Sequence, residues 1–118
     1  MTLRIDLSAV HRQLVLELLA ELLPPSAQVW VFGSRATGRA RRYSDLDLLI
    51  DVGRPLSLDE AALLREGFEE SDLPYRVDIV DWHAIGDRFR QLIAAQRILL
   101  NAPVEKAATD QEAEPPQV

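Results

Sequence analysis

Residues 32–52 read FGSRATGRARRYSDLDLLIDV, and this stretch decides how the rest of the chain is interpreted. It opens with a Gly-Ser pair, continues through four arginines in eight positions and ends in an alternation of aspartate with leucine. Successive strand residues point to opposite faces of a sheet, so Asp45 and Asp47 share one face and the intervening leucines take the other. An ionised carboxylate is costly to bury unless it is paired or bound to a metal. The alternation therefore predicts either a solvated strand edge or a functional site.

Length and composition predict one small globular domain. The chain has 118 residues, 47% of them hydrophobic, and it contains no cysteine. A disulfide framework and a thiolate metal site are therefore excluded, and the absence of cysteine fits the cytoplasm. We expect a folded domain over residues 1–102 and a disordered acidic tail over residues 103–118. Three of the seven prolines lie in that tail, which lacks an apolar period.

The net charge and the hydropathy pattern limit the kinds of partner that the chain is expected to have. The net charge of −6 argues against a nonspecific grip on nucleic acid, so no direct nucleic-acid binding is expected. The N-terminal sequence MTLRIDLSAVHRQ lacks the apolar core of a signal peptide. The longest apolar run, residues 14–23, is interrupted by two glutamates and is too short to span a bilayer. These features predict a cytoplasmic protein without a membrane partner.

Hydrophobic periodicity predicts the order helix, strand, strand, helix, strand, helix. The first helix ends before Pro24-Pro25, and the Ser57-x-x-Glu60 pair has the form of a capping box that opens the second. Trp30 is expected in the core, as is Phe32. The order implies an α/β fold with one small sheet flanked by helices. The expected helices are 7–22, 57–68 and 85–99, and the expected strands are 28–33, 44–52 and 75–82.

Two common phosphate and metal motifs can be rejected. Residues 33–40 resemble a P-loop, but they end in Arg-Ala where the motif requires Lys followed by Ser or Thr. The Asp45-x-Asp47 pair resembles the start of an EF-hand loop, but Ile50 stands where the sharp turn of that loop requires glycine. Neither a P-loop nor an EF-hand explains the segment.

A strand that ends at Gly33 and turns into a helix beginning with Ser34 suits a different phosphate site. Such a helix start presents unpaired backbone N–H groups, and Gly33 lets a ligand approach the backbone closely. The chain then returns as a strand whose Asp45 and Asp47 side chains lie about 6.6 Å apart on one face. Two carboxylates beside a phosphate site predict Mg²⁺, which binds through a few carboxylates plus substrate phosphates.

On these residues the chain resembles a known superfamily. Gly33-Ser34, ten residues and Asp45-x-Asp47 match GSX10DXD, the signature of DNA polymerase β-type nucleotidyltransferases. The small size is similar to that of the minimal nucleotidyltransferase (MNT) domain, the antitoxin partner of HEPN toxins. The resemblance extends over most of residues 8–100 and implies a mixed sheet with strand order 1-2-3.

The superfamily also uses a third carboxylate on the following strand, for which YRVDIVDW offers two aspartates. Asp78 lies within the apolar run and is favoured. Asp81 sits at the end of the run, where an N-cap is the expected role.

The resemblance implies a cytoplasmic enzyme that moves AMP from ATP to a protein hydroxyl. Asp45, Asp47 and Asp78 would be catalytic and would ligate two Mg²⁺ ions, or Mn²⁺, while Gly33 and Ser34 would hold the β- and γ-phosphates. The acceptor implied is a tyrosine of a cognate HEPN ribonuclease toxin, with which the chain would form a stable complex. One or more of the clustered arginines would neutralise the triphosphate: Arg35, Arg39, Arg41 and Arg42.

Two other functions stay open. The same fold, catalytically weak or inactive, would neutralise its partner by occlusion. A small-molecule nucleotidyltransferase would share the motif, but such enzymes usually carry extra helical substrate domains, for which nothing after residue 100 provides material. His11 and His83 are isolated and are expected to be surface or capping residues.

Overall fold

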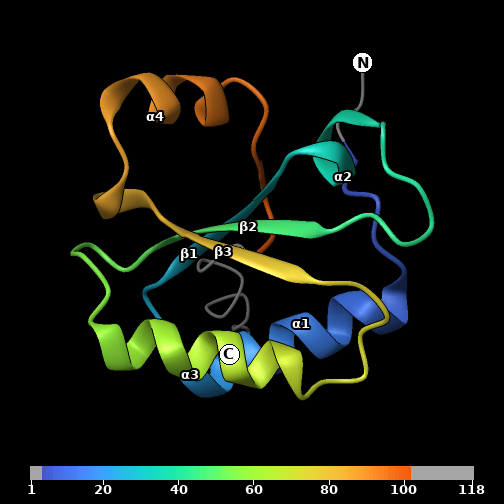
Figure 1. Ribbon diagram of the computed structural model, residues 1–118, viewed down its shortest axis with the longest axis horizontal. Helices are drawn as coiled ribbons and strands as arrows, with labels where there is room; N and C mark the ends of the chain where they lie inside the picture. The colour runs from blue at the N-terminus through green and yellow to red at the C-terminus, as the bar shows by residue number, and fades with distance from the viewer. Residues whose placement is uncertain (1–3, 102–118) are drawn as a thin grey trace, which may run out of the picture.

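The computed structural model describes residues 4–101, which form a four-stranded sheet with helices on both faces (Figure 1). The expected tail over residues 103–118 lies outside the described residues. No helix within residues 4–101 is long and apolar enough to cross a membrane. The elements are α1 Ala9–Leu22, β1 Gln28–Phe32, α2 Ser34–Thr37, β2 Leu46–Asp51, α3 Leu58–Glu69, β3 Val77–Asp81, the 3₁₀ turn η1 Trp82–Ala84, α4 Asp87–Ala94 and β4 Ile98–Leu99.

The sheet has the strand order β3-β2-β1-β4. β2 runs antiparallel to β1 and parallel to β3, which confirms the expected mixed sheet and the order of its first three strands. β2 is therefore central, and its register places Asp47 opposite Phe32 on one side and opposite Asp78 on the other. The fourth strand, β4, pairs antiparallel with the free edge of β1.

The expected closing helix over residues 85–99 is wrong at both ends. α4 begins at Asp87 after the 3₁₀ turn η1 and ends at Ala94, and the chain then becomes extended as β4. The backbone N–H of Leu100 donates to the carbonyl of Val29 at 2.8 Å, and Leu100 is buried. Pairing with the edge of β1 and burial of Leu100 stabilise the extended conformation more than the helical spacing of the apolar residues stabilises a helix. Both contributions come from tertiary contacts, which the local sequence pattern does not contain.

The main core lies between the sheet and the layer formed by α1 and α3, on the lower face in Figure 1. The core-facing residues predicted for β2 are fully buried there: Leu46, Leu48 and Ile50. The opposite face carries α2 and α4 (Figure 1) and holds Trp30 and Phe32, which are only partly buried rather than central to the core. Trp30 lies under the Arg97 guanidinium, 4.2 Å from its ring centroid, and Phe32 meets Phe89 edge-to-face.

Side-chain caps determine where the helices α1 and α3 begin. The Ser8 hydroxyl accepts the His11 backbone N–H at the start of α1, so this helix begins two residues after the expected position. The predicted capping box is confirmed at α3, where the Ser57 and Glu60 side chains accept each other's backbone N–H groups. These caps fix where α1 and α3 begin, and the core residues of both helices pack them under the sheet, which leaves its other face for the site.

Candidate active site

Three carboxylates meet at one end of the central strand. Asp47 lies in β2 and its in-register neighbour Asp78 lies in the parallel strand β3, so both side chains project from the same face. Asp45 directly precedes β2 and reaches the same place, because one guanidinium contacts both Asp45 and Asp78. The structure thus brings together the three aspartates that the sequence singled out, although β2 and β3 are shorter than the expected strands.

Asp47 occupies the centre of this group and has the most perturbed electrostatics. The pKa of the Asp47 carboxyl is raised to about 6, mainly by burial and then by the charges of Asp78 and Asp45. The Asp78 carboxyl also lies within hydrogen-bonding reach of Asp47. Carboxylates that crowd in this way cannot all stay ionised at low cost without a nearby cation.

Arg76 supplies a cation in the described structure. Its Nη2 lies 3.3 Å from Oδ2 of Asp45, and its Nε lies 3.4 Å from Oδ1 of Asp78. The Arg76 side chain is 70% exposed, so it lies across the mouth of the site without being packed into it. Within residues 4–101 no three His, Asp or Glu side chains have the geometry of an assembled metal centre. The donors nevertheless fit Mg²⁺ or Mn²⁺ in type, since three carboxylates gather around a place that already attracts a cation.

The Gly33-Ser34 pair adjoins the carboxylates on the β1 side. Gly33 has a φ of +74°, a conformation that favours glycine, and α2 is a single turn that follows it. The Gly33 carbonyl accepts the N–H groups of Ala36 and Thr37, and its own N–H donates to Oε1 of Gln96 at 2.7 Å. Within residues 4–101 the Ser34 hydroxyl makes no hydrogen bond, so it is available to a ligand.

The clustered arginines divide into one structural residue and three exposed ones. Arg35 is 5% exposed and donates to the carbonyls of Asp6, Arg42 and Ser44, while its guanidinium stacks on the Tyr75 ring at 4.0 Å. Arg35 is therefore occupied in holding the signature loop and is not a candidate for the triphosphate.

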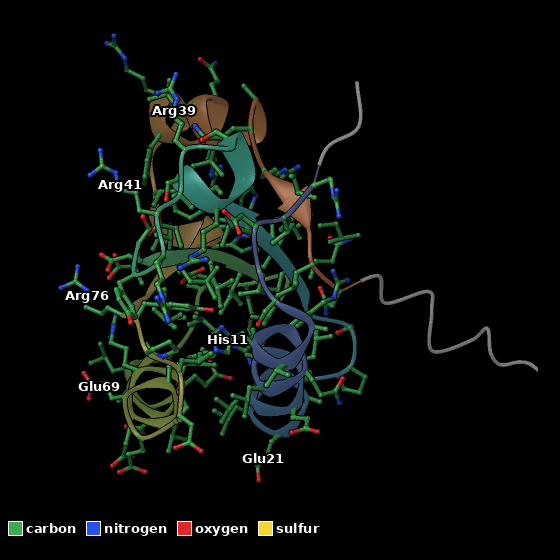
Figure 2. All side chains as sticks on the ribbon, turned by 90° about the vertical axis from the view of Figure 1, so that its right-hand side faces the viewer. His11, Glu21, Arg39, Arg41, Glu69 and Arg76 are labelled. Carbon is green, nitrogen blue, oxygen red and sulfur yellow. The ribbon has the colours of Figure 1, made fainter. Side chains whose placement is uncertain are left out.

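The other three arginines of the cluster stay available. Arg39 and Arg41 extend from the loop toward solvent (Figure 2), and Arg42 is also exposed. The guanidinium of Arg42 lies over the Tyr43 ring, 5.4 Å from its centroid.

Asp81 and the two histidines that the sequence singled out have structural partners. Asp81 caps the 3₁₀ turn by accepting the His83 backbone N–H, as expected, and it also accepts the Leu56 N–H. The His83 ring lies 2.7 Å from the Asp51 carboxylate, and the His11 ring lies 3.0 Å from the Tyr75 hydroxyl. Neither histidine belongs to the carboxylate group.

Sequence reasoning missed two residues of the site, Arg76 and Gln96. Arg76 stands two residues before Asp78 in YRVDIV, so the strand period already placed both side chains on one face. Gln96 gave no such signal, because its contact with Gly33 depends on the chain leaving α4 and returning along β1.

Comparison with known proteins identifies the fold that presents these residues. Residues 12–101 match the model of the family described as "Nucleotidyltransferase domain". The chain belongs to the nucleotidyltransferase family. This nucleotidyltransferase is 42% identical over 90 residues to a Haemophilus influenzae protein named "Probable protein adenylyltransferase MntA". The match covers 76% of this chain and 78% of the relative. The family membership agrees with the resemblance drawn from the GSX10DXD signature.

Solved structures share the arrangement of elements. A structure provisionally described as a minimal nucleotidyltransferase is 38% identical, with a TM-score of 0.57 over 75% of this chain and 88% of its own. A toxin–antitoxin structure with AMP-PNP has a TM-score of 0.66 at 22% identity, covering 85% of this chain and 86% of its own. A complex of a tri-AMPylated Shewanella oneidensis HEPN toxin with an MNT antitoxin has a TM-score of 0.59 at 20% identity, covering 85% and 83%. At these lower identities the likeness is one of fold.

Proposed function

We propose that this nucleotidyltransferase moves AMP from ATP to a hydroxyl of a HEPN-type toxin, a tyrosine by family resemblance, and thereby acts as its antitoxin. The observation that carries the proposal is the meeting of Asp45, Asp47 and Asp78 beside Gly33 and Ser34. The 42% identity to a protein named as an adenylyltransferase supports the AMP transfer. The fold shared with HEPN–MNT complexes supports the partner.

The two ends of the site have different tasks in this proposal. The Ser34 hydroxyl binds the β- and γ-phosphates beside Gly33, whose own N–H is held by Gln96, and exposed arginines of the loop neutralise charge on the triphosphate. The acceptor hydroxyl attacks the α-phosphorus, the bond to the β-phosphate oxygen breaks, and pyrophosphate leaves. Asp78 lies at the opposite end from Gly33 and receives the proton of the attacking hydroxyl.

Asp45, Asp47 and Asp78 would hold two Mg²⁺ or Mn²⁺ ions, which supply Lewis-acid stabilisation of the attacking and leaving oxygens when bound. A cation at this place would favour the ionised carboxylates, because burial first, and then the charges of Asp78 and Asp45, raise the pKa of Asp47. The exposed Arg76 side chain can leave the space between Asp45 and Asp78 when a stronger cation arrives.

Neutralisation by occlusion remains the second candidate, because Arg76 already pairs with two of the three carboxylates. An antitoxin of that kind would need the surface of the domain and not its chemistry. Asp47→Asn separates the two functions, since it removes a carboxylate and leaves the outer surface unchanged. Retained neutralisation of the toxin by Asp47→Asn would favour occlusion.

The test is transfer of label from ATP carrying ³²P in the α-phosphate, with Mg²⁺ and a purified HEPN-type partner. We expect one labelled protein band with the wild-type chain and none with Asp45→Asn, Asp47→Asn or Asp78→Asn. Asp72→Asn is the matched control, because Asp72 is exposed and lies in the turn between α3 and β3. Label that appears with all three active-site variants, or with none of the proteins, would overturn the proposed activity.

A further inference from the structure

The segment that follows α4 holds the edge of β1 with two amide side chains. Its strand β4 consists only of Ile98–Leu99. Beyond the two ends of β4, the side chains of Gln96 and Asn101 accept hydrogen bonds from the backbone of β1 and of the residue after it. The Gln96 amide contacts the glycine of the signature, whereas the Asn101 amide lies at the opposite end of β1.

The contact of Gln96 is with the peptide that opens the signature. Its Oε1 accepts the Gly33 N–H at 2.7 Å, in a partly buried place. The antiparallel register of β1 and β4, continued by two residues, puts Gln96 opposite Gly33. The backbone N–H of Gln96 already donates to the Ile93 carbonyl at 3.0 Å, so the side chain makes this contact. Glycine has the greatest backbone freedom of any residue, so an outside bond restricts its peptide strongly.

The neighbours of Gln96 hold its backbone in place. The Arg97 N–H donates to the same Ile93 carbonyl at 2.9 Å, and the Ile93 side chain is buried. The Arg97 guanidinium contacts the rings of Trp30 and Trp82, 4.2 and 4.9 Å from their centroids. A side chain with its backbone fixed on both sides is suited to orient a residue of a binding site.

Gly33 is thereby held from two sides. The Asp47 carboxylate packs against it from β2, and the Gln96 amide binds it from the side of β4. Ser34 follows Gly33 directly, so the place of its hydroxyl depends on how the Gly33 peptide is oriented. Loss of the bond from Gln96 would leave this peptide freer and the hydroxyl less well placed for a ligand.

We propose that Gln96 is a positioning residue for the phosphate end of the active site. Through Gly33 it holds the Ser34 hydroxyl where the β- and γ-phosphates of a nucleoside triphosphate bind. This role rests on the proposed function. It affects the affinity for the triphosphate, whereas the carboxylates on β2 and β3 perform the transfer.

Asn101 offers a matched control, because its side chain has the same structural task far from the signature. Its Oδ1 accepts the Val29 N–H at 2.7 Å, and its Nδ2 donates to the Ala27 carbonyl at 3.0 Å. Within residues 4–101 the Gln96 side chain makes only the bond to Gly33. If only the hydrogen bonding of the sheet edge mattered, loss of the Asn101 amide would therefore be the more damaging change.

Three variants separate the two roles. Gln96→Met and Asn101→Leu keep side chains of similar size and remove the amides, and Gln96→Glu keeps an acceptor for the Gly33 N–H. Hydrogen exchange of the Gly33 amide is followed by NMR without nucleotide. Binding of ATP with Mg²⁺ is titrated calorimetrically, and transfer of α-³²P-labelled AMP to a purified HEPN-type partner is measured at increasing ATP concentration.

We expect Gln96→Met to speed exchange of the Gly33 amide about tenfold, to weaken ATP binding about tenfold and to raise KM for ATP by a similar factor. Its kcat should change less than about threefold, because a phosphate contact made equally in the ground and transition states alters KM alone. Asn101→Leu should leave all these quantities near the wild-type values. Gln96→Glu should restore the slow exchange of the Gly33 amide.

Equal ATP affinities of Gln96→Met and Asn101→Leu would overturn the role of Gln96, as would exchange of Gly33 in Gln96→Glu as fast as in Gln96→Met. If Asn101→Leu does not fold, the contrast in Gly33 exchange between the two Gln96 variants decides alone. A wild-type chain that binds ATP but transfers no label, with binding weakened only in Gln96→Met, would uphold this role and overturn the proposed transfer. A wild-type chain that binds no ATP would overturn both.

Discussion

The carboxylate of Asp47 packs directly against the Cα atom of Gly33, so that a Cβ atom at position 33 would overlap with Oδ2 of Asp47. The glycine of the signature is therefore required twice, once by its positive φ and once by the side chain of the central aspartate. The side chain of Asp47 in β2 fits against the turn after β1 only because residue 33 has no Cβ atom. Their contact links the proposed phosphate end of the site to its carboxylate end.

Gly33→Ala should therefore cost more than backbone strain alone. We expect a loss of about 2–3 kcal/mol in the free energy of unfolding and a large loss of AMP transfer, because Asp47 must move. Gly38→Ala is the matched control: Gly38 also has a positive φ, but nothing lies within 4 Å of its Cβ position. That variant should lose only about 1 kcal/mol and keep most of its activity. Urea unfolding and the labelling assay compare the two, and equal losses would contradict the packing argument.

Asp47→Asn should stabilise the metal-free chain at neutral pH. The pKa of Asp47 is raised from 3.8 to about 6 in the folded state, so the folded state binds the proton more tightly than the unfolded state. The contribution of Asp47 to the free energy of unfolding is therefore lost as the pH rises from about 4 through 6. After discounting for partial exposure we expect Asp47→Asn to gain about 1 kcal/mol over the wild type at pH 7.5 in EDTA.

The difference between the two proteins should shrink as the pH falls from 6 toward 4, because folded-state Asp47 becomes protonated below its pKa of about 6 while the unfolded-state carboxyl loses its charge only around 3.8. Urea unfolding between pH 4 and 8 measures it, with Asp72→Asn as the control that should show no such trend. A wild-type chain whose stability relative to Asp47→Asn does not change over this range would show that Asp47 has an ordinary pKa.

Arg76→Gln should tighten binding of divalent cations. The Arg76 guanidinium lies between Asp45 and Asp78 and competes for the same oxygens, although its high exposure makes the contact weak. We expect the Kd for Mn²⁺ without nucleotide to fall about three- to tenfold, as measured by electron paramagnetic resonance. Arg41→Gln removes an exposed arginine of the signature loop and should leave the Kd near the wild-type value. An unchanged Kd in Arg76→Gln would show that Arg76 does not occupy the cation position.

Arg35→Met should destabilise the fold by about 3 kcal/mol. The variant removes the buried guanidinium and leaves the partly buried carbonyls of Asp6, Arg42 and Ser44 without their donor. Arg35→Lys should recover little of this loss, because one ammonium cannot reproduce the planar fork that stacks on Tyr75. Arg42→Met removes an exposed arginine from the same cluster and should change the free energy of unfolding by less than about 0.5 kcal/mol. Full recovery by lysine would mean that charge alone is required.

The sequence by itself determined the features that depend on local periods and local hydrogen bonds. The alternation from Asp45 to Ile50 predicted the burial of Leu46, Leu48 and Ile50, which the structure confirms; it did not predict Leu49, which is also fully buried. The capping box at Ser57 and the capping role of Asp81 also followed from neighbours within three residues. Because the period of a strand is two, the placement of Asp47 and Asp78 on one face of the sheet needed only the mixed sheet that the signature implied.

Only the tertiary structure decided the features that depend on partners far away in the chain. The stretch after α4 carries a helical pattern, yet it becomes β4 because the edge of β1 is available for pairing and Leu100 gains burial. Arg35 resembled its neighbouring arginines in sequence and became structural because three carbonyls and Tyr75 converge on it. The raised pKa of Asp47 likewise arises from burial and from charges on a neighbouring strand. Long-range contacts such as these have no local period, so the sequence pattern does not contain them.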